Sequence, residues 1–101
     1  MLIGGAGNDR LFGGRDVDIL EGGDGRDTVS GDAGDDALLG GDGNDTLSGG
    51  KGKDTIEAGP GEDVASGGLG DDILAGGSGK DTLSGNTGDD DLRGGADDDS
   101  L

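Results

Sequence analysis

The stretch GGDGNDTLSGGKGKDTIE, residues 40–57, decides the fold because it consists of two nine-residue units of one pattern. Each unit begins with two glycines, has glycine at its fourth position and aspartate at its sixth, and carries an aliphatic residue at its eighth. From Gly4 the chain divides without insertion or deletion into eleven such units, the last of them one residue short. We number the positions within each unit from 1 to 9. A fixed period of this kind indicates a repeat architecture.

The pattern holds along the whole chain. All 28 glycines fall at positions 1, 2 and 4. Position 6 is aspartate in every unit: Asp9, Asp18, Asp27, Asp36, Asp45, Asp54, Asp63, Asp72, Asp81, Asp90 and Asp99. Position 8 is aliphatic in every unit: Leu11, Leu20, Val29, Leu38, Leu47, Ile56, Ala65, Leu74, Leu83, Leu92 and Leu101. Leu2 continues the position-8 series backwards.

Five residues replace glycine at these positions: Asp16, Asp32, Ala58, Asn86 and Asp97. Four of the five are Asp or Asn, the non-glycine residues that best tolerate a positive φ, and they stand at positions 2 and 4. We therefore predict a left-handed backbone at positions 2 and 4. Ala58 stands at position 1 and leaves two alternatives: position 1 needs no positive φ, or unit seven carries a strain of about 1 to 2 kcal/mol.

The composition excludes most familiar functions. With 27% hydrophobic residues and a net charge of −17, an ordinary hydrophobic core is out of reach, and disorder is the default expectation. The chain has no Cys and no His, so disulfides, thiolate nucleophiles and His-bearing zinc sites are excluded. Its negative charge repels nucleic acids and anionic membranes, and no apolar run is long enough to span a bilayer. A cation is the natural partner.

The repeat predicts an all-β fold. Six residues rich in Gly and Asp favour a turn, and the three that follow have the strand period of two, with the position-8 side chain inside. A turn after each very short strand reverses the chain, so two units form one coil of a parallel β-solenoid with two sheets. We expect residues 1–101 to form one such array, about 27 Å long with strands about 4.8 Å apart. Aspartates of odd units then form one column, and those of even units another.

This fold needs more than its aliphatic residues. Burial of eleven aliphatic side chains is too small to offset the conformational entropy lost when a glycine-rich chain is ordered. Stacked carboxylates about 5 Å apart also repel one another by several kcal/mol. A bound metal is therefore predicted to organise the chain, so that binding and folding are one event. Carboxylates and turn carbonyls are hard oxygen ligands, which favours Ca²⁺ over Mg²⁺ or zinc.

The pattern GGxGxDxUx, where U is aliphatic, resembles the repeats-in-toxin (RTX), or haemolysin-type calcium-binding, family. It occurs in strict GGxGxD form at 4–9, 22–27, 40–45, 49–54, 67–72 and 76–81. The resemblance implies a right-handed parallel β-roll in which each calcium ion lies between units i and i+2, held by the position-6 carboxylates and by turn carbonyls. The carbonyls carried over from the strict units are those of Gly4, Gly5, Gly7, Gly22, Gly23, Gly25, Gly40, Gly41, Gly43, Gly49, Gly50, Gly52, Gly67, Gly68, Gly70, Gly76, Gly77 and Gly79.

The two columns offer at most nine gaps for calcium, whose +18 would nearly neutralise the chain's −17. Strict units flank a gap on both sides only between Asp9 and Asp27, between Asp27 and Asp45, and between Asp54 and Asp72. Unit seven, AGPGEDVAS, is predicted to be the weakest, because Ala65 is small and Pro60 lacks a backbone donor.

The other acidic residues, including Asp24, Asp35, Asp42, Asp71, Asp89, Asp91 and Asp98, occupy variable positions and are interpreted as a solvated face. Thr28, Thr46, Thr55 and Thr82 at position 7, together with Phe12, Leu39 and Ile73, are predicted to point outward.

The leading functional hypothesis is a calcium-binding, calcium-folded module with no enzymatic activity of its own. The resemblance implies an extracellular protein that leaves a Gram-negative cell by type I secretion, and we expect the chain to be a fragment of such a secreted, toxin-associated protein. Neighbouring domains of that longer chain would then be partners. The alternative is the accessory or secretion domain of an RTX enzyme or toxin, such as a protease, lipase, epimerase, haemolysin or adhesin. A third hypothesis is a permanently disordered acidic linker.

Overall fold

The computed structural model describes all residues, 1–101, and contains eleven strands and no helix. The strands are β1 (Leu2–Ala6), β2 (Arg10–Gly14), β3 (Ile19–Asp24), β4 (Thr28–Ala33), β5 (Ala37–Asp42), β6 (Thr46–Lys51), β7 (Thr55–Glu57), β8 (Val64–Leu69), β9 (Ile73–Ser78), β10 (Thr82–Thr87) and β11 (Asp91–Ala96). The chain is therefore all-β, as predicted, and no helix is available to cross a membrane.

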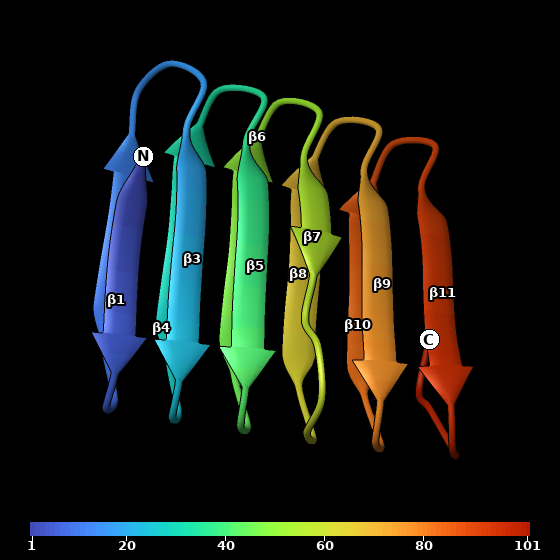
Figure 1. The fold of residues 1–101 in the computed structure, drawn as a ribbon. Helices are drawn as coiled ribbons and strands as arrows, with labels where there is room; N and C mark the ends of the chain where they lie inside the picture. The colour runs from blue at the N-terminus through green and yellow to red at the C-terminus, as the bar shows by residue number, and fades with distance from the viewer.

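The strands alternate between two parallel sheets. Odd-numbered strands form a six-stranded sheet in the order β1-β3-β5-β7-β9-β11, and even-numbered strands form a five-stranded sheet behind it (Figure 1). Within each sheet a residue pairs with the residue 18 positions further on, as Leu20 does with Leu38. Two units therefore make one coil, which confirms the predicted β-solenoid. The Cα positions extend over 30 × 28 × 12 Å, so the coils form a flat slab.

The strands are longer than the sequence predicted. Most contain six residues and run from position 7 of one unit to position 3 of the next, as β3 does from Ile19 to Asp24. The prediction of three-residue strands was wrong because it assigned positions 1 to 3 to the turn. These positions pair with the next coil, as Gly5 does with Gly23 and Ala6 with Asp24. Only positions 4 to 6 remain as the turn.

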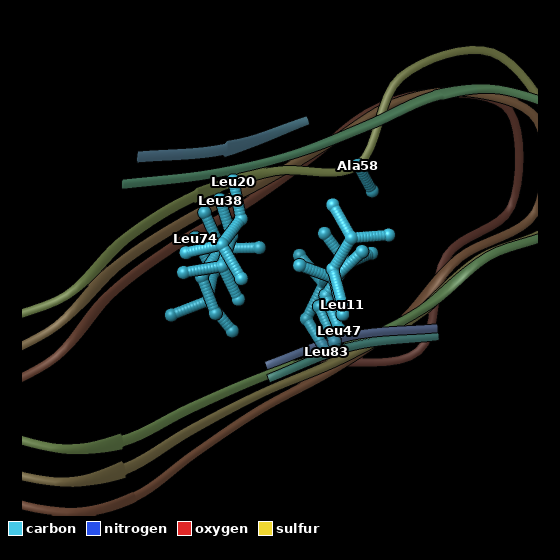
Figure 2. Packing of buried hydrophobic residues seen from close by; sticks show 10 residues of the cluster. Leu11, Leu20, Leu38, Leu47, Ala58, Leu74 and Leu83 are labelled. Carbon is cyan, nitrogen blue, oxygen red and sulfur yellow. The ribbon is translucent and has the colours of Figure 1, made fainter. Parts of the chain in front are cut away.

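The core consists of the predicted position-8 side chains. Figure 2 shows Leu20, Leu38 and Leu74 of the six-stranded sheet facing Leu11, Leu47 and Leu83 of the five-stranded sheet. Position 8 is buried from Leu11 to Leu83, including Ala65, and it is more exposed at both ends of the stack. The predicted outward residues are exposed, among them Thr28, Thr46, Thr55, Thr82, Phe12, Leu39 and Ile73.

The backbone conformation confirms the prediction for positions 2 and 4. Every residue at these two positions has a positive φ, including the non-glycine residues Asp16 (75°), Asp32 (72°), Asn86 (68°) and Asp97 (76°). No residue at position 1 does, and Ala58 is no exception. The first of the two alternatives for position 1 therefore holds, and another reason is needed for its glycine.

Unit seven departs from the regular fold. Strand β7 ends at Glu57, directly before Ala58, and has only three residues where its neighbours β5 and β9 have six. Its register with both neighbours accordingly stops at Glu57. The strand ends before Ala58, although Gly41 N–H still donates to Ala58 O at 3.0 Å and Gly43 N–H to Pro60 O at 3.1 Å. The lower stability of this unit remains a prediction.

Candidate metal centre

The position-6 aspartates lie at the turns and point into the slab. Their side chains are at most 3% exposed in seven interior units: Asp27, Asp36, Asp45, Asp54, Asp63, Asp72 and Asp81. Those nearest the ends of the stack, Asp9, Asp18, Asp90 and Asp99, are half-buried. The aliphatic rows therefore lie in the middle of the slab, and one column of carboxylates runs along each of its two turn edges.

Each column is held together by one repeated hydrogen bond. The backbone N–H of Asp27 donates to Oδ1 of Asp45 at 2.8 Å, and the N–H of Asp45 donates to Oδ1 of Asp63 at 2.7 Å. The same bond, between 2.7 and 3.0 Å long, recurs at every step of both columns. The structure thus brings together all eleven predicted aspartates as an odd and an even column.

The second carboxylate oxygen has no partner. In nine of the eleven units Oδ2 is buried and accepts no hydrogen bond: Asp9, Asp18, Asp27, Asp36, Asp45, Asp54, Asp63, Asp72 and Asp81. No cationic side chain approaches these groups, since the one ion pair of the structure joins Arg93 to Asp91 on the surface. A buried carboxylate without a counter-charge is costly. A bound cation or a proton at these oxygens would remove this cost.

The turn also offers carbonyl oxygens. Position 4, represented by Gly7, Gly25 and Gly43, lies outside the strands, and its carbonyl accepts no hydrogen bond. These carbonyls point along the stack, because a Cβ on Gly25 would collide with the carbonyl of Gly7, and one on Gly43 with that of Gly25. Each gap between coils therefore contains unused oxygens from the backbone as well as from the carboxylates.

Position 1 is glycine because it faces the carboxylate. A Cβ on Gly22 would lie 2.6 Å from Oδ2 of Asp27 and 2.6 Å from the carbonyl oxygen of Gly40 in the next coil. The same crowding by the unit's own Oδ2 occurs at every glycine at position 1. The repeat pattern alone does not predict this role of position 1. The sequence gives one indication of it: the single replacement at position 1 is alanine, whereas Asp and Asn replace glycine at positions 2 and 4.

This donor set fits calcium. Nowhere do three or more acidic side chains form a group that could hold a metal, so a site would combine the carboxylates of adjacent units with backbone carbonyls. Ca²⁺ accepts six to eight oxygens, carbonyls included, in flexible geometry, whereas Mg²⁺ demands near-octahedral geometry. The unpartnered oxygens of the turns are of the hard type that Ca²⁺ prefers.

Burial changes the acidity of the columns. Loss of hydration raises the pKa of Asp54 and of Asp63 from an ordinary 3.8 to about 6, against the lowering effect of one backbone hydrogen bond, and neighbouring carboxylates add to the rise. The pKa values of Asp36, Asp45, Asp72 and Asp81 are raised for the same leading reason. Without a metal, these six carboxyl groups therefore take up a proton at a higher pH than an ordinary aspartate does.

Acid should partly replace calcium. Because the pKa of Asp54 and Asp63 is raised to about 6 in the folded chain, protonation stabilises the fold. That contribution is complete below pH 3.8 and is lost as the pH rises through 6. In a chelator, we expect a larger strand signal in circular dichroism at pH 5 than at pH 7.5. The calcium concentration at half-folding should also fall as the pH drops through 6, because protons then stabilise the fold while the unfolded aspartates remain ionised. Equal calcium-free spectra at both pH values would contradict this prediction.

A further ladder lies outside the carboxylate columns, at position 5. Oδ1 of Asn8 accepts the backbone N–H of Arg26 at 2.9 Å, and Oδ1 of Asn44 accepts that of Glu62 at 2.9 Å. Asp35 and Asp71, interpreted from sequence as merely solvated, make the same bond while remaining exposed. Asp24 and Asp42 are exposed as predicted.

Comparison with known proteins agrees with this geometry. The model of the RTX calcium-binding nonapeptide repeat matches the chain in four copies, at residues 1–29, 30–65, 39–74 and 66–101. Together these matches cover every coil of the slab. A search of curated proteins found no match. On the repeat pattern, the parallel two-sheet solenoid and the family match, the chain belongs to the RTX calcium-binding nonapeptide repeat family, whose repeats bind calcium.

Proposed function

We propose that this chain is a calcium-folded module, in which calcium ions occupy the gaps between successive position-6 aspartates. The observation that carries the proposal is the set of nine buried Oδ2 atoms without a partner, in a chain of net charge −17. The position-4 carbonyls of the same turns also accept no hydrogen bond. The chain is a calcium-binding repeat domain and contains no recognisable catalytic domain.

The residues proposed to hold calcium are the eleven position-6 aspartates and the turn glycines of the strict units. When bound, the ion would supply the positive charge that the buried carboxylates lack. The chain's own part is to order the carboxylates, through the Oδ1 hydrogen bonds, and to keep their Oδ2 atoms away from water. Because a raised pKa opposes ionisation, the calcium-free fold is expected to be weak at neutral pH.

We further propose that the module acts outside the cell, as part of a larger secreted protein. RTX repeats are typical of secreted proteins. The conformational entropy lost when a glycine-rich chain is ordered also lowers its calcium affinity. The expected dissociation constant is therefore that of extracellular calcium-binding modules, about 10⁻⁴ to 10⁻³ M. The chain would then be unfolded at cytosolic calcium and folded after export. A midpoint below micromolar calcium would contradict this part of the proposal.

Metal removal and replacement test the function. In a chelator at pH 7.5 we expect a spectrum of a disordered chain by far-UV circular dichroism, and a strand spectrum after addition of millimolar calcium. Magnesium at the same concentration should give much less strand, because Mg²⁺ surrenders its waters reluctantly and needs short, octahedral contacts. Titration calorimetry should show heat for calcium in the same range. Equal folding by both ions would reduce the site to general charge screening, and no response to either would overturn the proposal.

A further inference from the structure

Ala58 is the one residue at position 1 that carries a side chain. Its side chain is completely buried and belongs to the core cluster. Figure 2 shows it apart from the two aliphatic rows, on the side where the chain turns. Position 1 faces the carboxylate column in every other unit, so Ala58 brings a methyl group toward the column of odd units.

The regular units show what occupies that place. A Cβ on Gly22 would lie 2.6 Å from both Oδ2 of Asp27 and the carbonyl oxygen of Gly40, and one on Gly4 would lie 2.7 Å from Oδ2 of Asp9. In unit seven the corresponding oxygens are Oδ2 of Asp63 and the carbonyl of Gly76. The Cβ of Ala58 therefore occupies the place that lies, in the other units, between the carboxylate Oδ2 and the carbonyl oxygen of the next coil.

The backbone around Ala58 is spaced differently from that of the other units. The carbonyl of the preceding coil lies 2.6 Å from the Cβ position of Gly59 and of Gly77, but closer than 2.5 Å at every other position-2 glycine with such a neighbour. Strand β7 also ends immediately before Ala58. The coils nevertheless stay joined, because Gly41 N–H donates to Ala58 O at 3.0 Å and Ala58 N–H donates to Ala75 O at 2.9 Å.

We propose that Ala58 interrupts the odd column of calcium sites and makes the gap between Asp63 and Asp81 the weakest in the chain. This inference rests on the proposed calcium binding. The even column has glycine at position 1 of every unit, so it remains continuous. Calcium would then load the chain in two steps: first the even column with the other odd gaps, and then the gap between Asp63 and Asp81.

The test removes the methyl group. In Ala58→Gly we expect a calcium midpoint for the last-loading sites that is about three- to tenfold lower, because the crowding of the Asp63 carboxylate is relieved. The direction is diagnostic, since replacing alanine by glycine ordinarily destabilises a fold through backbone entropy. Ala75→Gly is the matched control. Ala75 lies in β9, where its carbonyl accepts the Ala58 N–H, and it occupies position 9, whose side chain points away from the column. This substitution should leave the midpoint unchanged or raise it.

The reverse substitution provides a second arm. Gly22→Ala should create a new interruption beside Asp27, so that about one calcium ion moves from the first loading step to the second, as measured by equilibrium dialysis over a range of calcium concentrations. If the parent chain binds calcium but Ala58→Gly behaves like Ala75→Gly, the inference is overturned and the calcium-folded module stands. If the parent chain binds no calcium by calorimetry, both proposals fall.

Discussion

Asp45→Ala is expected to raise the calcium concentration needed for half-folding by at least about tenfold. Asp45 lies in the interior of the odd column, between Asp27 and Asp63, so its carboxylate adjoins two proposed calcium sites. The substitution also leaves the Asp27 N–H, which donates to Oδ1 of Asp45 at 2.8 Å, without its acceptor. The shift is measured by circular dichroism during a calcium titration, with calorimetry for the number of sites.

The matched control is Asp42→Ala in the same unit. Asp42 carries the same charge three residues earlier, but its side chain is exposed and makes no hydrogen bond. It should shift the midpoint little, or lower it slightly by reducing repulsion in a chain of net charge −17. Asp99→Ala, at the end of the column, should fall between the two because Asp99 adjoins one gap. Equal shifts for Asp42→Ala and Asp45→Ala would show that diffuse charge, rather than a defined site, attracts the calcium.

Asp45→Asn separates the two functions of this side chain. The amide keeps an oxygen for the Asp27 N–H and removes the charge. We expect the calcium midpoint to rise, while the calcium-free fold at pH 7.5 should become more stable, because an unpaired buried charge has been removed. The measurement is the strand signal in a chelator at pH 7.5, which should be larger for Asp45→Asn than for the parent chain. Equal spectra would contradict the destabilising role of the buried charge.

Gly43→Ala is the second substitution with a large expected effect, a loss of more than about 3 kcal/mol of calcium-saturated stability. Gly43 has φ +125°, which costs an alanine about 1 to 2 kcal/mol. Its Cβ would also lie 2.8 Å from the carbonyl carbon of Gly25 in the preceding coil. The coils would have to separate at this turn, and the unused carbonyls of the gap would move with them. Urea unfolding at a fixed, saturating calcium concentration measures the loss.

Gly7→Ala isolates the conformational part of that effect. Gly7 occupies the same position of a strict unit with φ +108°, but its Cβ would meet no atom within 4 Å. It should cost only the left-handed strain, about 1 to 2 kcal/mol. If both variants lost the same stability, contact between coils would contribute nothing to the requirement for glycine at position 4.

The sequence alone determined the features that depend on a residue and its close neighbours in the chain. The nine-residue period predicts the alternation of turn and strand, and the aliphatic residue at position 8 predicts the core. Asp16 and Asn86, standing where glycine is usual, predicted positive φ because that preference belongs to the individual residue. Two units per coil follow from a turn after every strand, so the two aspartate columns were predictable too.

Other features were decided only by the tertiary structure, because they depend on contacts between residues 18 apart. The strands extend into positions 1 to 3 because those glycines find a partner in the next coil. Position 1 requires glycine because the carboxylate of Asp27 turns inward against Gly22. No local pattern contains that contact: the side chain turns inward because its Oδ1 accepts an N–H from the preceding coil, which leaves Oδ2 buried and unpaired. The stacking of coils therefore creates the oxygen-rich gaps.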